Sequence, residues 1–467
     1  MSVLRHTVAS ALVALLLGAL LVVVSTQDSD AAVASRPVPV TPVLSMRRLP
    51  EVMLGAVADP KYGEAMDSYL SRTAGSSCAM VSQNGRIVYS RDTGARLSPA
   101  STLKLLTATA ALDVLGADTV LTTRMVSASE PSDGVIDGDL TIIGSGDPLL
   151  VTSGYKQSLE DPDQRTEDFG AVADAVVAAG VRRITGAVIG DDSLLDRTRW
   201  IPSWPSRYQI GGVVAPLSAL LVNDGQTGFV DHPERPTADR KPGDPPALAA
   251  ATLRSMLIAR GVQIDGGAAA GTAPQDAHEV ATFESVPVRD IVGEMITDSD
   301  NTTAEMLTRL IGLRASGSGT TSAGVAAIRD SLDRSGLPVE DLVMVDGSGL
   351  DTMNRASCAL LLETLRRLPS DSPVTSALAV AGRSGTLRKR LIDTAAAGKV
   401  RAKTGTLSTV NALAGLADPK AGPTLTFSMI ENGSDPRGTG VTDGFAERVV
   451  TYGDGRRLEP LLPAPPR

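Results

Sequence analysis

Three short polar motifs constrain this fold most, because they can form one site only if distant parts of the chain meet. Ser101-Thr102-Leu103-Lys104 places a hydroxyl and an amine three residues apart, on one face of a helix predicted for about residues 101–115. Ser299-Asp300-Asn301 begins 198 positions after Ser101, and Lys403-Thr404-Gly405 follows near the end of the chain. We therefore expect a domain that is interrupted between the first two motifs.

The rare residue types limit the chemistry. The chain has three His and two Cys, so metal cages and His-based Ser triads have few candidates, and we predict no metal and no cofactor. Basic residues are mostly Arg, so each Lys is of interest as a cation that can lose its proton at modest cost. The formal net charge of −9 also argues against a nucleic-acid partner.

The Ser-x-x-Lys pattern is weak by itself, and it occurs twice. Ser153-Gly154-Tyr155-Lys156 follows no helix-start signal and contains a Gly, whereas Ser101 stands at the start of an apolar helix. The positive end of that helix dipole favours an alkoxide-like oxygen. The structural alternatives are a capping Ser101, a solvated Lys104, and a Ser299 motif that only caps the following helix.

The N-terminus predicts export. Arg5 precedes an apolar run over 8–24, and an Ala-Val-Ala sequence ends at Ala34. This pattern is typical of a secretory signal peptide cut after Ala34, with an uncleaved N-terminal anchor as the alternative and the only membrane contact. Either reading places the rest of the chain in the periplasm, the cell wall or the extracellular space.

Composition changes along the chain predict its domains. Short strand-like runs and Gly-Asp turns dominate between about 123 and 245, and helical patterns resume afterwards. The expected parts are a signal peptide or anchor (1–34), a linker (35–54), a split catalytic domain (55–122 and 246–455), an inserted domain (123–245) and a flexible tail (456–467). His232 and His278 fall in polar, loop-like stretches.

In their order and local context, the three motifs resemble the active-site set of penicillin-binding proteins and class A β-lactamases. The chain resembles the D-alanyl-D-alanine carboxypeptidases of peptidase family S13, the penicillin-binding protein 4 group of low molecular mass class C. The likeness runs from about residue 77 to 446 and includes five further segments: Pro99–Thr107, Gly144–Pro148, Pro216–Leu220, Asp346–Leu350 and Gly385–Arg390. Asp351-Thr352-Met353 departs from the family pattern, and the insertion is short enough for one inserted domain.

The resemblance implies an α+β fold. Its catalytic domain is a five-stranded antiparallel sheet beside a helical part, and here a mostly-β domain would interrupt it. The implied enzyme is a serine D-Ala-D-Ala carboxypeptidase that acts on peptidoglycan peptides ending in D-Ala-D-Ala through an acyl-enzyme, with β-lactam antibiotics as inhibitors. Endopeptidase activity uses the same chemistry and stays open.

The resemblance also implies roles for the acylation step. Lys104, its pKa lowered by burial and by the charge of Lys403, would take the proton of Ser101. The backbone N–H groups of Ser101 and Thr406 would form the oxyanion hole.

The remaining motif residues would handle the leaving group and the substrate. Ser299 would relay a proton to the leaving amine, and Asn301 would hydrogen-bond the peptide. Lys403 and Thr404 would bind the terminal carboxylate.

Several alternatives stay open. Cys78 and Cys358 lie 280 positions apart and form either a disulfide or two buried thiols. A second alternative is a catalytically inactive, exported protein that binds the cell wall, although such a protein has no need to keep the five motif residues intact. A class A β-lactamase needs a deacylating Glu, and no Glu-x-x-Leu-Asn stretch is present. A related esterase more often carries Tyr-x-Asn.

Overall fold

The computed structural model describes residues 49–73, 75–229, 242–420, 422–433, 438 and 440–453, with backbone alone for 49–58. The predicted signal peptide, most of the linker, His232 and the tail lie outside the described residues. Ala58–Arg456 forms one compact unit. Within the described ranges, no helix has the length and apolar character that a bilayer crossing requires.

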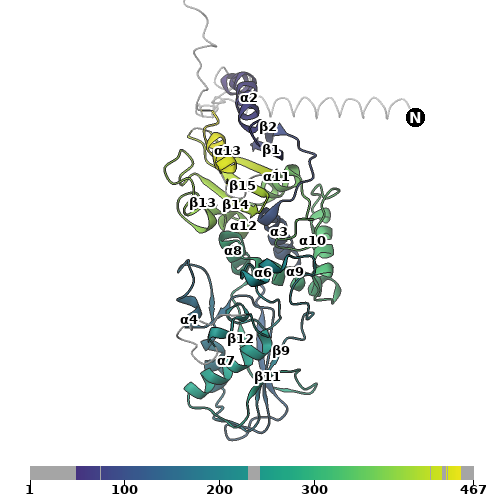
Figure 1. Cartoon of the computed structure of the whole chain (residues 1–467), viewed down its shortest axis with the longest axis vertical. Helices are drawn as coiled ribbons and strands as arrows, with labels where there is room; N and C mark the ends of the chain where they lie inside the picture. The colour runs from purple at the N-terminus through teal and green to yellow at the C-terminus, as the bar shows by residue number, and fades with distance from the viewer. Residues whose placement is uncertain are drawn as a thin grey trace, which may run out of the picture. The chain divides into compact units, whose positions relative to one another are not determined.

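The catalytic region is built on an antiparallel sheet with the order β13-β14-β15-β16-β1-β2 (Figure 1). We expected five strands, and the sheet has six. The extra strand, β13, is only two residues long and pairs Ala379 with Ala402 on β14, too short to leave a period-2 pattern in the sequence. The strands are β1 (Ser76–Gln83), β2 (Arg86–Arg91), β13 (Ala379–Val380), β14 (Val400–Leu407), β15 (Val410–Ala417) and β16 (Leu425–Asn432).

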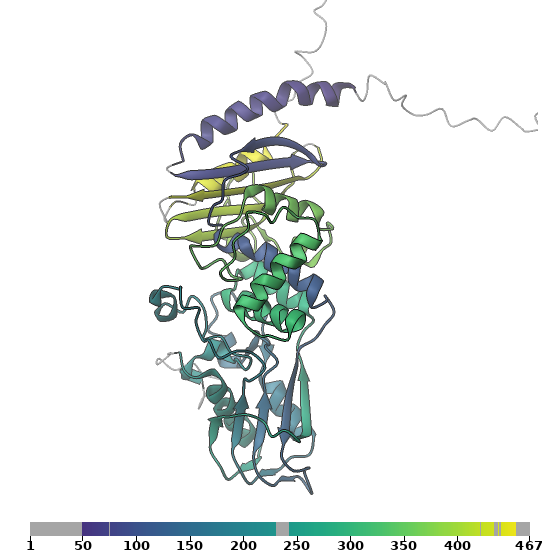
Figure 2. The same ribbon diagram turned by 90° about the vertical axis from the view of Figure 1, so that its right-hand side faces the viewer.

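Alternating side chains give this sheet two buried faces. Cys78 and Met80 of β1 join a core with the helical part, whereas Ala79 and Val81 join a core on the opposite face. Figure 2 shows the green helices of the helical part below the strands. The helical part contains η1 (Ala100–Leu103), α3 (Lys104–Val114), α8 (Val288–Asp298), α9 (Asn301–Ser316), α10 (Thr321–Arg334), α11 (Cys358–Arg367) and α12 (Pro373–Ser376).

Two helices cover the other face of the sheet. They are α2 (Leu49–Leu70), through Met66 and Leu70, and α13 (Gly440–Val450), through Phe445 and Val449. Pro60 lies inside α2. The helix therefore begins before the Pro, a residue that usually starts a helix.

A disulfide joins Cys78 of β1 to Cys358 at the start of α11. The backbone carbonyl of Cys358 also accepts a hydrogen bond from the Ser428 hydroxyl of β16 at 2.7 Å. The disulfide thus links β1 of the sheet to the helix that packs on the sheet, across 280 positions of sequence.

The insertion contains a five-stranded mixed sheet with the order β11-β9-β5-β3-β12 and a three-stranded one with the order β10-β8-β4. We expected mostly strands, but helices α5 and α7 complete its core through Val172, Val176, Leu253 and Leu257. Its elements are β3 (Thr122–Ser127), β4 (Val135–Ile136), β5 (Leu140–Ile143), β6 (Leu150–Val151), α4 (Ser153–Lys156), β7 (Glu167–Asp168), α5 (Gly170–Ala178), β8 (Arg183–Ile184), β9 (Val188–Asp191), α6 (Ser206–Ile210), η2 (Asn223–Gly225), η3 (Thr227–Phe229), α7 (Pro245–Ala259), β10 (Gln263–Ile264), β11 (Ala268–Ala270) and β12 (His278–Glu284).

Strand pairing moves the second boundary of the insertion. β12 pairs antiparallel with β3, from His278 opposite Ser127 to Glu284 opposite Thr122. The boundary therefore lies after Glu284 and not at 245. The change in composition near 245 precedes α7, which is an internal helix of the insertion. His278 is exposed, but it lies on a strand and not in a loop.

Candidate active site

Ser101 lies on a single 3-10 turn, η1, and α3 begins at Lys104. The sequence had suggested one continuous helix. Ala100, directly before Ser101, has a positive φ of 46°, a conformation that non-Gly residues rarely adopt and that concentrates at functional sites. The turn is fixed by the hydroxyl of Thr102, which donates to the Pro99 carbonyl at 2.7 Å.

The Lys104 side chain is fully buried and its Nζ has three acceptors. They are Ser101 Oγ at 3.0 Å, Asn301 Oδ1 at 2.7 Å and the Ser348 carbonyl at 2.8 Å. Burial lowers the pKa of Lys104 to about 8, against the opposing effect of nearby carboxylates, led by Asp300. A neutral Lys104 keeps two N–H groups for Asn301 and Ser348, and its lone pair can then face Ser101.

Ser348 is a part of the site that sequence reasoning missed. In the sequence, Asp346–Leu350 stood out only as a segment that resembles the family. Its contribution is a backbone carbonyl, which any residue supplies, so the side-chain pattern carries no signal for it.

Ser299 connects α8 to α9 in a left-handed conformation, with φ 64°. This conformation is uncommon for a non-Gly residue because it strains the backbone, and residues strained in this way concentrate at functional sites. Asp300 performs the capping, because its Oδ1 accepts from Thr303 N at 2.7 Å. The Ser299 hydroxyl is therefore free to accept from Lys403 Nζ at 2.6 Å.

Lys403, Thr404 and Thr406 lie on β14, the strand that faces η1. Gly405 permits this close approach, because a Cβ there would lie 2.7 Å from the Pro99 carbonyl oxygen. The Thr404 hydroxyl donates to Thr386 Oγ1 at 2.9 Å. Thr406 pairs in register with Asn411 of β15.

The electrostatic coupling between the two lysines differs from our expectation. Lys403 is fully buried, and burial together with the charge of Lys104 lowers its pKa well below the usual value. The pKa of Lys104, in contrast, is lowered by burial and not by Lys403. The structure therefore disfavours two charged amines at once.

A cavity of about 480 Å³ opens beside Ser299 and Asn301. One wall comes from the insertion, where Asp161 pairs with Arg388 and Glu160 pairs with Lys389 at 3.0 Å. Nothing in the sequence indicates that residues after α4 line this cavity, because the contact depends on how the insertion packs.

The second Ser-x-x-Lys motif forms a one-turn helix, α4, which Thr152 caps. The sequence had shown no helix-start signal here, so that reading was wrong. Ser153 and Lys156 are both exposed, however. They lack the buried environment that lowers the pKa of Lys104.

The fold and the juxtaposed Ser, Lys and Asn side chains are the arrangement expected of the class of serine hydrolases that carries the S-x-x-K, S-D-N and K-T-G motifs. Residues 64–239 and 227–448 match the D-Ala-D-Ala carboxypeptidase 3 (S13) family. The chain belongs to this family, as the motifs predicted.

Named relatives agree with this assignment. A D-alanyl-D-alanine carboxypeptidase of Actinomadura sp. (strain R39) is 31% identical over 442 residues, which cover 79% of each chain. A carboxypeptidase of Mycobacterium tuberculosis is 29% identical over 378 residues, covering 78% of this chain and 77% of the relative. The crystal structure of penicillin binding protein 4 from Haemophilus influenzae matches with a TM-score of 0.69 at 19% identity, covering 83% of this chain and 98% of that one. The predicted α+β fold is thereby confirmed.

Proposed function

We propose that this chain is a serine D-Ala-D-Ala carboxypeptidase that acts on peptidoglycan peptides through an acyl-enzyme on Ser101. The observation that carries the proposal is the fully buried Lys104 amine, 3.0 Å from Ser101 Oγ and 2.7 Å from Asn301 Oδ1. A nucleophile and a base within hydrogen-bond reach, with the base oriented by a third group, are what covalent catalysis requires.

Acylation begins when neutral Lys104 takes the Ser101 proton. The Ser101 oxygen bonds to the carbonyl carbon of the penultimate D-Ala, and the carbonyl oxygen becomes an oxyanion. The N–H groups of Ser101 and Thr406 stabilise that charge, since η1 and β14 approach each other closely at Gly405. Asn301 and the Ser348 carbonyl hold the resulting ammonium of Lys104.

Ser299 passes a proton to the leaving nitrogen, and the C–N bond breaks to release D-Ala. The proton can come from Lys403, whose Nζ donates to Ser299 at 2.6 Å. The terminal carboxylate of the substrate binds Lys403 and Thr404 and favours the charged form of Lys403.

Water then adds to the acyl carbonyl carbon, and the ester bond to the Ser101 oxygen breaks. Lys104 returns its proton to that oxygen, and the proton released by water replaces the one that Lys403 gave up. A β-lactam ring presents the same kind of carbonyl and would acylate Ser101 by the same route. The Haemophilus influenzae penicillin binding protein 4 has been crystallised in complex with a β-lactam. This structural relative supports β-lactam binding here.

We further infer that the chain is exported through residues 1–34 and acts in the cell wall, where its substrate lies. The basic start, apolar run and Ala-Val-Ala sequence support export. The disulfide between Cys78 and Cys358 also fits an oxidising compartment.

Release of D-Ala from a synthetic peptide ending in D-Ala-D-Ala tests the activity. The intact chain should release one D-Ala per peptide, and Ser101→Ala should release none. Ser153→Ala, in the exposed second motif, is the matched control and should behave as the intact chain does. An intact chain without activity, or an active Ser101→Ala variant, would overturn the proposal.

A further inference from the structure

Helix α9 carries three polar residues at four-residue spacing: Asn301, Glu305 and Arg309. Residues i and i+4 lie on one helix face, so the three form a row along α9. Glu305 and Arg309 are fully buried, which is rare for charged residue types unless they have partners. Of the three, Asn301 contacts Lys104 directly.

Glu305 binds the loop Asp346–Leu350, which supplies the third acceptor of Lys104. Its Oε1 accepts from the backbone N–H groups of Gly347 at 3.0 Å and Ser348 at 2.8 Å. The carbonyl of the same Ser348 accepts from Lys104 Nζ at 2.8 Å. One carboxyl oxygen therefore fixes the residue whose carbonyl touches the base.

The rest of the loop is fixed on both sides. Asp346 accepts from Gly349 N at 2.8 Å and from the indole N–H of Trp204 at 2.9 Å. A Cβ at Gly347 would lie 1.8 Å from Thr308 Oγ1 on α9. The loop is thus pressed against α9, and the position of Ser348 depends on how α9 holds it.

Gly349 brings the same loop against the turn that carries the nucleophile. Its φ is 83°, and a Cβ there would lie 2.0 Å from the Ala100 carbonyl oxygen. A displacement of the loop would therefore reach η1 as well as Lys104.

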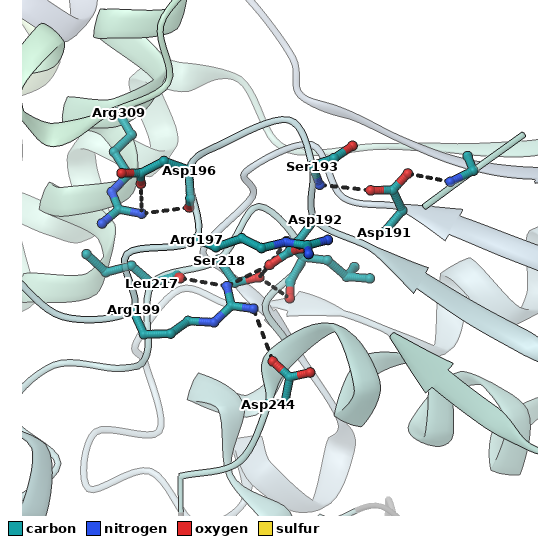
Figure 3. A network of polar contacts seen from close by, with 12 residues as sticks. Asp191, Asp192, Ser193, Asp196, Arg197, Arg199, Leu217, Ser218, Asp244 and Arg309 are labelled. Carbon is teal, nitrogen blue, oxygen red and sulfur yellow. Dashed lines mark hydrogen bonds and ion pairs between the residues drawn. The ribbon is translucent and has the colours of Figure 1, made fainter. Parts of the chain in front are cut away.

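Arg309 attaches this row to the insertion. It pairs with Asp196 at 2.7 Å and donates to the Thr198 carbonyl at 2.6 Å. Figure 3 shows Arg309 and Asp196 meeting beside a second polar cluster, in which Asp192 accepts from Arg199 at 2.6 Å. Arg309 thereby fixes α9 against the segment 196–199 of the insertion.

We propose that Glu305 is a positioning residue for the reaction of Ser101. Its side chain is long enough to hold Ser348 where the Ser348 carbonyl contacts Lys104. The inference rests on the proposed function, because it assigns Lys104 the role of base.

Four carboxyl groups and one amine face Lys104. Asp300, Asp346, Glu305 and Glu294 oppose the lowering of its pKa by burial, and Lys403 lies across the site. The Ser348 carbonyl favours the ammonium form of Lys104 by accepting its N–H. Loss of that contact lowers the pKa of Lys104 and also removes a restraint on the amine.

Two conservative variants separate the reach of Glu305 from its acidity. Burial raises the pKa of Glu305 to about 8, so Gln matches its mostly neutral form at pH 7 and retains its length. Glu305→Asp keeps the acid but shortens the side chain by one methylene, which withdraws the oxygen from the two N–H groups. Asp191→Asn is the matched control, because Asp191 also accepts from two backbone N–H groups, those of Ser193 and Ala273, within the insertion.

The assay is the rate of labelling by a fluorescent penicillin between pH 6 and 10. Glu305→Asp should slow labelling about tenfold, as expected when buried backbone N–H groups lose their acceptor, and should move the acidic limb to lower pH. At pH 7, where Glu305 is mostly neutral, Glu305→Gln should stay within about threefold of the intact chain, since one neutral acceptor replaces another. Asp191→Asn should leave the acidic limb unmoved.

The opposite pattern overturns the proposal. This is the result if Glu305→Asp keeps the acidic limb of the intact chain, or if Glu305→Gln loses as much activity as Glu305→Asp. It is also the result if Asp191→Asn shifts the limb equally. A failure of the intact chain to react at Ser101 would instead reject the proposed function, so the two failures are distinguishable.

Discussion

The pH dependence of Ser101 acylation follows from the environment of Lys104. The base must be neutral to accept the Ser101 proton, and burial lowers the pKa of Lys104 to about 8. A lowered pKa enlarges the neutral fraction below the usual titration range. The rate should therefore rise through neutral pH and level off above about pH 9.

The size of the effect follows from the titration. With a pKa of about 8, roughly one Lys104 in ten is neutral at pH 7, whereas with an unperturbed pKa near 10.4 the fraction is about one in 2,500. Burial thus raises the fraction of Lys104 that is neutral at pH 7 about 200-fold. The rate should rise about tenfold between pH 6 and 7, and about fivefold from pH 7 to 8.

Stopped-flow labelling with a chromogenic or fluorescent penicillin measures this rate directly. Lys104→Arg is the informative variant, because Arg stays protonated throughout this range and should abolish acylation at each pH. An acidic limb centred near pH 10.5, a rate independent of pH, or rapid labelling of Lys104→Arg would refute the assignment of Lys104 as base.

Three further predictions concern the frame of the site. Cys78→Ser with Cys358→Ser should lower the free energy of unfolding by about 2–5 kcal/mol, measured by denaturant titration. Equal stability of the intact chain with and without reductant would contradict this. Gly405→Ala should slow acylation at least tenfold, because its Cβ would lie 2.7 Å from the Pro99 carbonyl oxygen and must force β14 from η1; an unchanged rate would show that the strand can yield. Trp204→Phe should cost about 1–3 kcal/mol, since its N–H donates to a buried carboxylate, and a change below 0.5 kcal/mol in the same titration would count against that bond.

The contacts among the motif residues could be predicted because they are made by side chains that the sequence shows. Ser101 and Lys104 are three positions apart, so their contact follows from local geometry. The 198 positions between Ser101 and Ser299 required an insertion, and the structure has one. These inferences need only helix periodicity and the requirement that the motifs meet.

The features that escaped prediction depend on tertiary packing or on the backbone. The Ser348 carbonyl has no side-chain signature, and β13 is too short for a period-2 pattern. The predicted end of the insertion near residue 245 differs from the structure because β12 pairs with β3 across more than 150 positions. The row of Glu305 and Arg309 did carry a signal, namely two charged residues at i and i+4 among the apolar residues of one helix.

The most direct test of the account is to locate the covalent adduct after incubation with penicillin. Mass spectrometry of the digested intact chain should find one penicilloyl group on the peptide that contains Ser101, and Ser101→Ala should carry none. An adduct on another residue, no adduct on the intact chain, or equal labelling of Ser101→Ala would contradict the assignment of Ser101 as the nucleophile.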